Sequence, residues 1–148
     1  EIDLGSGTWT IPAERMKAER EHIIPLSPAA VALFERAAQH RRGDSKLVFP
    51  GLKRGKPLSD MTLTKVLRDM GHGDITVHGF RSTFRDWVSD CTSYPRELAE
   101  AALAHVLENK VEAAYQRSTM IEKRRDLMNA WGKYAEGSAV PNVVRITR

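Results

Sequence analysis

Three short segments of the chain carry residues that could together attack a phosphodiester. His78 and Arg81 lie in a His-Gly-Phe-Arg segment, His105 follows Leu-Ala, and Tyr115 stands ten residues after His105. A tyrosine hydroxyl can act as a covalent nucleophile, and histidine can donate or accept a proton near neutral pH. Arginine binds phosphate oxygens through paired hydrogen bonds. The set suits attack on a phosphodiester without a metal ion or another cofactor.

Each of these residues also has an ordinary structural explanation. A His-x-x-Arg pair is usually a polar helix face, and His105 could simply interact with the dipole at a helix C-terminus. Tyr115 could be a core residue beside Val111 and Ala114. The chemistry is therefore credible only if the secondary-structure elements bring the residues to one site.

The elements predicted from the sequence form a mainly α fold with a small N-terminal antiparallel β-hairpin or sheet, an α+β arrangement. Residues 8–11 and 22–26 are β-branched or aromatic and predict a hairpin with a long polar connection. The chain of 148 residues has the length of one domain. Helices are expected over residues 28–42, 60–70, 77–91, 95–105, 110–116 and 120–135.

Local signals fix the helix starts and faces. Ser27 followed by Pro28 is typical of an N-cap and first helical position, and Ser59 is a second expected N-cap. In the helix over 77–91, His78 and Arg81 are expected to share a face that Arg85 continues. The apolar residues expected on the second helix are Met61, Leu63, Val66, Leu67 and Met70, and those expected in the core from the third are Phe80, Phe84 and Trp87 or Val88.

The charge pattern favours a nucleic-acid partner. The chain has 23 basic and 19 acidic residues, a formal charge of +4, which alone fits an ordinary surface equally well. The basic residues nevertheless cluster at 15–20, 36–42, 53–56 and 123–125, as suits a phosphate backbone. Possible backbone contacts, which would hold DNA without reading its sequence, are Arg85, Lys53, Arg54 and Lys56.

The single cysteine and the hydropathy pattern favour a cytoplasmic protein. Cys91 is the only cysteine, which excludes an intramolecular disulfide and a multi-cysteine metal site. No apolar run approaches the roughly 20 residues of a membrane span, and the first residues do not resemble a signal peptide. We therefore expect no membrane association and no resident metal.

Taken together, the motifs resemble those of the tyrosine recombinases, most closely the integrases of temperate phages and genomic islands. That family's catalytic domain carries a lysine on a β-hairpin, which Lys17 matches, and then a His-x-x-Arg, which His78 and Arg81 match. A second histidine and a tyrosine about ten residues later correspond to His105 and Tyr115. The resemblance extends over residues 8–135, and several elements in order make it far more specific than one motif.

The resemblance implies a role for each residue in site-specific DNA recombination. Tyr115 would attack a DNA phosphodiester to give a 3′-phosphotyrosyl bond, and Arg81 would stabilise the charge of the transition state. His78 would accept the tyrosine proton, His105 would hydrogen-bond the phosphate, and Lys17 would protonate the leaving 5′-oxygen. The family works on double-stranded DNA attachment sites as a homo-oligomer, a tetramer, when a mobile element such as a prophage integrates or excises.

The sequence departs from the family pattern in two places. The family's first arginine lies in a helix before the hairpin, and Arg15 and Arg20 lie in the hairpin connection, where they cannot replace it. We therefore expect residues 1–137 to be a catalytic domain truncated at its N-terminal side, inactive alone, and residues 138–148 to be a tail. The other departure is Ala104, where the family often has glycine.

Two other classes of protein remain as alternatives. A non-catalytic helical DNA-binding accessory module would fit the basic clusters but leaves the Tyr115, His78, Arg81 and His105 set unexplained. A metal-dependent nuclease would need a cluster of carboxylates to hold two metal ions, and the sequence has no such cluster.

Overall fold

The computed structural model describes residues 1–41, 43, 45–105 and 117–138, with the backbone alone for residues 117–119. Tyr115, the helix predicted over 110–116 and the tail beyond residue 138 lie outside these residues. The chain divides into two compact units. Unit 1 comprises Glu1–Val31 and Phe84–Arg148, and unit 2 comprises Ala32–Thr83.

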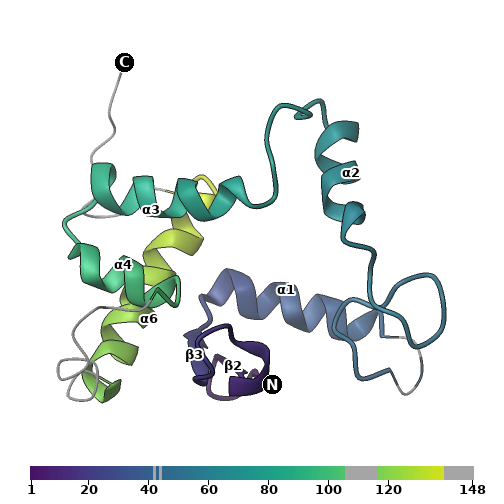
Figure 1. The fold of residues 1–148 in the computed structure, drawn as a ribbon, viewed down its shortest axis with the longest axis horizontal. Coiled ribbons are helices and arrows are strands. Elements are labelled where there is room, and N and C mark those ends of the chain that lie inside the picture. Colours follow the sequence, from purple (N-terminus) through teal and green to yellow (C-terminus); the bar gives the residue numbers. More distant parts are fainter. Residues whose placement is uncertain (42, 44, 106–116, 139–148) are drawn as a thin grey trace. The chain divides into compact units, whose positions relative to one another are not determined.

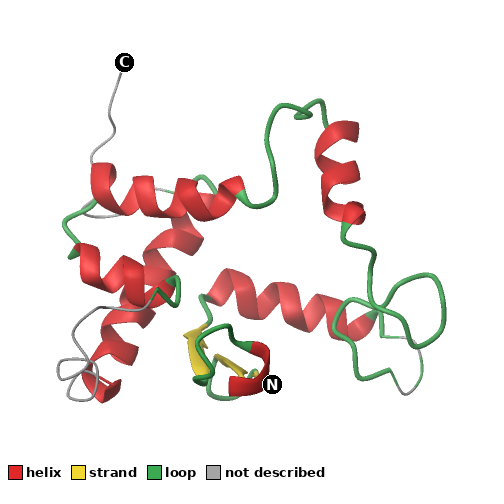
Figure 2. Cartoon of the chain, viewed as in Figure 1, coloured by secondary structure: helices red, strands yellow, loops and turns green. Residues whose placement is uncertain are grey.

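Unit 1 begins with a three-stranded antiparallel sheet in the order β1-β2-β3, drawn as yellow arrows in Figure 2. β2 (Thr8–Ile11) pairs with β3 (His22–Pro25), with Trp9 opposite Ile24. This pairing confirms the predicted hairpin, and its connection contains a short 3-10 helix, η1 (Ala13–Arg15). The two-residue strand β1 (Ile2–Asp3) is an addition to the prediction, because so short a strand shows no alternation in the sequence.

The helix after the hairpin begins as the sequence predicts. α1 (Pro28–Gln39) has proline at its first position, and the Ser27 hydroxyl accepts a hydrogen bond from the Ala30 backbone N–H at 3.2 Å. A serine in this position satisfies one of the backbone donors that a helix leaves free at its start. The helix ends at Gln39, a turn before the predicted end near residue 42.

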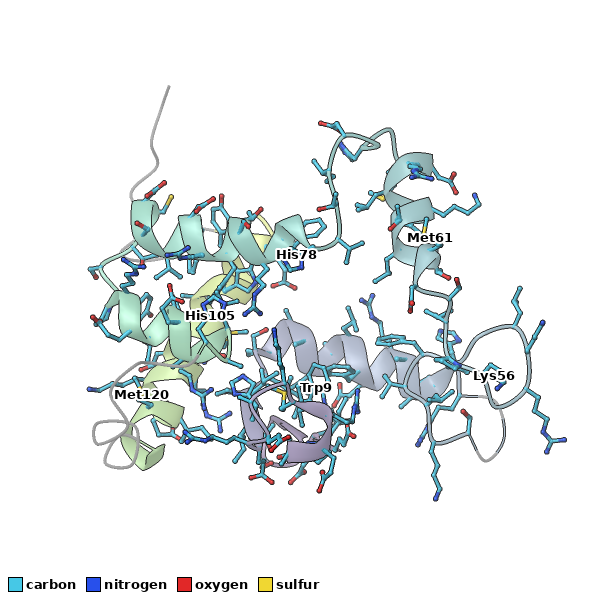
Figure 3. All side chains as sticks on the ribbon, in the orientation of Figure 1. Trp9, Lys56, Met61, His78, His105 and Met120 are labelled. Atoms are coloured by element: carbon cyan, nitrogen blue, oxygen red, sulfur yellow. The ribbon has the colours of Figure 1, made fainter. Side chains whose placement is uncertain are left out.

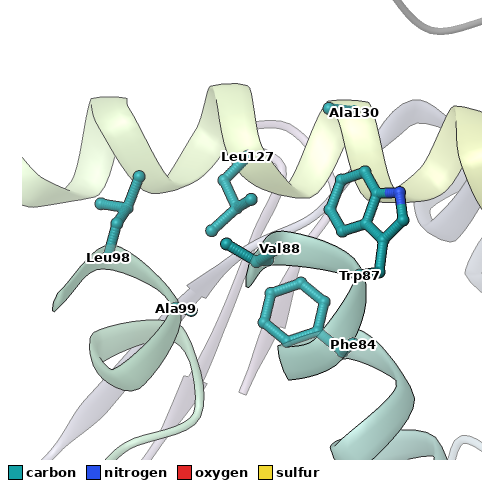
Figure 4. Packing of buried hydrophobic residues seen from close by; sticks show 7 residues of the cluster. All are labelled: Phe84, Trp87, Val88, Leu98, Ala99, Leu127 and Ala130. Atoms are coloured by element: carbon teal, nitrogen blue, oxygen red, sulfur yellow. The ribbon is translucent and has the colours of Figure 1, made fainter. Parts of the chain in front are cut away.

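The core of unit 1 lies among three helices, α3 (Gly79–Cys91), α4 (Arg96–Ala102) and α6 (Arg117–Ala135). Val88 of α3 and Leu127 of α6 are almost completely buried between them. Full burial of such a side chain contributes roughly 1.5–3 kcal/mol. The cluster, shown in Figure 4, consists of Phe84, Trp87, Val88, Leu98, Ala99, Leu127 and Ala130.

An aromatic group extends this core towards the end of α6. The Trp131 ring lies 5.3 Å from Phe84 in a T-shaped arrangement and 5.2 Å from Trp87. The prediction that Phe84, Trp87 and Val88 are core residues is confirmed. The prediction for Phe80 is wrong: its side chain is 50% exposed, because the buried cluster begins one helical turn later, at Phe84.

Unit 2 contains α2 (Met61–Asp69), labelled in Figure 1. A loop closed by a β-bridge between Pro50 and Pro57 precedes this helix. The N-cap of α2 is Asp60, one residue after the predicted Ser59, although the Ser59 hydroxyl accepts a hydrogen bond from the Met61 N–H at 3.3 Å. The apolar face predicted for this helix is largely exposed, with Met61, Leu63, Val66 and Met70 between 47% and 65% accessible. In the described part of the chain, no helix is long and apolar enough to cross a membrane.

Candidate active site

His105 stands just beyond the end of α4, where Figure 3 labels it. The prediction that it is part of this helix is wrong, because α4 ends at Ala102. Ala104 adopts a left-handed conformation with φ of 55°. The His105 N–H then donates to the Glu100 carbonyl at 2.9 Å, and the Ala104 N–H to that of Ala101 at 3.2 Å. These two bonds form a Schellman motif, which turns the chain out of the helix.

The His105 imidazole is held by a carboxylate. Its Nδ1 forms a hydrogen bond with Oε2 of Glu100, five residues earlier on α4. The Glu100 side chain is only 14% exposed, whereas that of His105 is 41% exposed. The bond therefore lies on the protected side of the ring, and part of the imidazole remains open to solvent.

Glu100 also gathers two guanidinium groups. The Nε atoms of Arg85 and Arg96 lie 3.0 and 3.6 Å from its Oε1. Oε1 of Glu100 is buried. Among the described residues it has these two ion-pair neighbours but no hydrogen-bond partner. The hydrogen bond from His105 is the main cause that lowers the pKa of Glu100; partial burial opposes it, and Arg85 and Arg96 contribute in the same direction as His105.

Two other elements support the turn that carries His105. Nε2 of His22, at the start of β3, lies 3.3 Å from the Ala102 carbonyl oxygen. Nη1 of Arg124 approaches the Ala101 carbonyl oxygen at 3.5 Å from α6. Arg124 is nearly buried, and this burial lowers the pKa of its guanidinium. The sheet and α6 thus both contact the C-terminal end of α4.

Lys17 lies in the connection between β2 and β3, just after η1, and its side chain is exposed. The connection turns where the Glu19 N–H donates to the Met16 carbonyl at 2.9 Å. Arg15, in the same connection, pairs with Glu1 at 2.6 Å. Lys17 and His105 both belong to unit 1, and the hairpin position predicted for Lys17 is the one observed.

Arg81 lies in the first turn of α3 and His78 directly before this helix, and both residues belong to unit 2. The prediction that His78 is a helical residue is wrong, because it lies in the turn before Gly79. The Arg81 N–H donates to the His78 carbonyl at 3.0 Å, and the Thr76 hydroxyl accepts from the Gly79 N–H at 3.0 Å. Thr76 thus caps α3, and a backbone hydrogen bond connects Arg81 in the first turn of the helix with His78 before it.

The candidate DNA-contact residues fall into two groups. Lys53, Arg54 and Lys56 are exposed in the loop of unit 2 between Pro50 and Pro57, and Figure 3 labels Lys56. Gly51 permits this loop, since a Cβ at its position would lie 2.4 Å from the Pro57 carbonyl oxygen. Arg85 differs from the loop residues, because its pairing with Glu100 would compete with phosphate.

The structure brings one part of the predicted site together within unit 1. Glu100 links His105 with Arg85 within unit 1, whereas His78 and Arg81 are placed within unit 2. Tyr115 lies outside the described residues. Glu100 is not among the site residues predicted from the sequence, although it is the only acidic residue between Glu97 and His105 and stands in an alanine-rich helix end.

Comparison with known proteins identifies the class of protein. The chain matches the phage integrase family over residues 1–122 and belongs to this family of tyrosine recombinases. It is 36% identical over 146 residues to the prophage integrase IntA of Escherichia coli K12, covering 97% of this chain and 35% of that protein.

Two other curated integrases are similar to this chain. The prophage integrase IntZ of the same bacterium is 38% identical over 128 residues, which cover 86% of this chain and 31% of IntZ. The integrase of Enterobacteria phage P4 is 33% identical over 153 residues, which cover 92% of this chain and 35% of that integrase. The chain thus spans about a third of the length of these relatives. No solved structure was found to match it.

Proposed function

We propose that the protein containing this chain is a site-specific recombinase that integrates or excises a mobile DNA element in the bacterial cytoplasm. The observation that carries the proposal is the family match over residues 1–122, which includes all five residues assigned to the chemistry. These residues are Lys17, His78, Arg81, His105 and Tyr115. Relatives named as prophage and phage integrases support the same activity.

In the proposed reaction Tyr115 attacks the phosphorus of a DNA phosphodiester. Its phenolic proton passes to His78, the bond from phosphorus to the 5′-oxygen breaks, and Lys17 protonates that oxygen. Arg81 and His105 bind the non-bridging oxygens and stabilise the charge that develops on them. A 5′-hydroxyl from a second strand then attacks the 3′-phosphotyrosyl bond and releases the tyrosine.

This reaction conserves the energy of the phosphodiester in the covalent intermediate, so strand exchange needs no nucleotide cofactor. Guanidinium and imidazolium groups provide the positive charge at the phosphate, a role that metal ions have in metal-dependent nucleases. Double-stranded DNA attachment sites are the proposed substrate, and a tetramer of the full-length protein on two sites is the proposed assembly.

The domain assignment is part of the same proposal. Residues 1–137 would belong to the catalytic domain, and residues 138–148 would form a tail. The full-length protein is the proper material for an activity assay, because this chain spans only about a third of the length of the curated relatives.

The test uses the full-length protein and a nicked suicide DNA substrate that carries the attachment site. We expect a covalent protein–DNA adduct that survives denaturant in the wild-type protein and is absent in Tyr115→Phe. Tyr134→Phe, a tyrosine of α6 outside the proposed chemistry, is the matched control and should retain the adduct. Tight, salt-sensitive DNA binding without an adduct would refute recombination and support the accessory DNA-binding module instead.

A further inference from the structure

We propose that Glu100 is a positioning residue for the reaction, which holds the His105 ring through Nδ1 so that Nε2 is presented to the scissile phosphate. This inference rests on the proposed function. It concerns a residue outside the set of five and assigns it a task that the contacts in unit 1 define.

The geometry gives Glu100 control over the orientation of the ring. Glu100 lies in the last full turn of α4, and His105 follows after the left-handed residue Ala104. The backbones of Glu100 and His105 are also joined, through the 2.9 Å bond from the His105 N–H to the Glu100 carbonyl. Backbone and side-chain bonds between the same two residues leave the imidazole little freedom to rotate.

The contact between the Glu100 carboxylate and the His105 imidazole determines which ring nitrogen carries the proton. An ionised carboxylate can only accept hydrogen bonds, so Nδ1 must donate. In the neutral ring Nε2 consequently carries the lone pair, and in the protonated ring Nε2 becomes a second donor. Only the protonated ring can hydrogen-bond a phosphate oxygen through Nε2, so contact with DNA would couple ring protonation to binding.

The charges around Glu100 favour its ionised form. Arg85 approaches it from α3 and Arg96 from its own helix. Arg124 of α6 and His22 of β3 reach the neighbouring carbonyls of Ala101 and Ala102. Arg85 and Arg96 therefore both place positive charge at the carboxylate that holds His105.

The first test measures the proton position directly, in the full-length protein, by long-range ¹H–¹⁵N correlation NMR at a pH where the ring is neutral. A His105→Gln variant assigns the signal. We expect the His105 ring in the Nδ1–H form in the wild-type chain, and loss of this preference in Glu100→Ala. A wild-type ring in the Nε2–H form would overturn the inference without reference to any variant.

The second test measures cleavage of the suicide substrate by the full-length protein. Glu100→Ala should slow adduct formation by about 10-fold to 100-fold, the usual effect of removing a partner that orients an active-site histidine. Glu100→Gln can still accept from Nδ1–H through its amide oxygen, and should recover part of the rate. Glu97→Gln, an exposed carboxylate on the same helix, is the matched control and should react at the wild-type rate.

The outcomes separate this inference from the proposed function. Absence of an adduct in the wild-type full-length protein refutes the proposed function, whatever the tautomer of His105. A normal adduct in the wild type, formed at the same rate by Glu100→Ala, refutes the positioning role alone. Equal losses in Glu100→Ala, Glu100→Gln and Glu97→Gln would indicate a general effect on α4 and would also overturn it.

Discussion

The left-handed residue before His105 gives a prediction whose magnitude can be worked from the backbone. Ala104 has φ of 55°, a conformation that costs an L-residue about 1–2 kcal/mol and glycine almost nothing. Glycine also gains about 0.4–1 kcal/mol of conformational entropy in the unfolded chain, which offsets part of the relief. Ala104→Gly should therefore raise the free energy of unfolding by about 0.5–1 kcal/mol.

The effect is measurable by urea and thermal unfolding of the 148-residue chain, followed by circular dichroism. For a chain of this size 1 kcal/mol corresponds to roughly 2–4 °C in Tm, so we expect an increase of about 1–4 °C. Ala101→Gly is the matched control. It lies within α4, where glycine costs about 0.5–1 kcal/mol. If both variants lose stability to the same extent, the left-handed turn does not govern this helix end.

Three further predictions concern the packing and titration of unit 1. Leu127→Ala, which truncates the most buried side chain of the core, should lower the free energy of unfolding by about 2–5 kcal/mol in urea titrations. A loss below about 1 kcal/mol would contradict the burial of Leu127 in this core. Gly132→Ala should cost about 1–3 kcal/mol in the same assay, because its Cβ would lie 2.6 Å from the Ser27 Oγ, and an unchanged midpoint would exclude this close approach. The pKa of Glu100 is lowered in the folded chain, so its contribution to stability is present above the ordinary value of 4.5 and is lost as the pH falls through the folded value. When the urea midpoint is plotted against pH, its fall at acid pH should be smaller for Glu100→Gln than for the wild-type chain. Parallel curves for the two proteins would refute the assignment.

The sequence predicted those parts of the fold that depend on local signals. Ser27 and Pro28 start α1 where expected, and the hairpin partners 8–11 and 22–26 pair as expected. The sequence predicted helix ends less well. A run of alanine and leucine up to His105 continues the helical pattern, and a left-handed alanine, unlike a glycine, gives no sign of a stop.

In the candidate site, too, residues with a local sequence signal were predicted and a residue without one was not. The residue types and spacing of His78, Arg81, His105 and Tyr115 indicate the family, because they follow a chemical requirement that is read along the chain. Glu100 was not predicted because its contact with His105 arises from the turn after α4, which brings a residue five positions later back to its carboxylate. A helical continuation would instead have separated the two side chains, since neighbours on a helix face are three or four residues apart.

The position of His105 depends on how the last carbonyls of α4 are satisfied. The Ala99 carbonyl accepts from the Leu103 N–H and the Glu100 carbonyl from the His105 N–H. The two that follow, on Ala101 and Ala102, are reached by Arg124 from α6 and His22 from the sheet. A helix end leaves four such acceptors, and partners from three elements engage them here. The histidine is therefore held by the packing of unit 1 as a whole, which explains how a residue outside any helix can have a defined orientation.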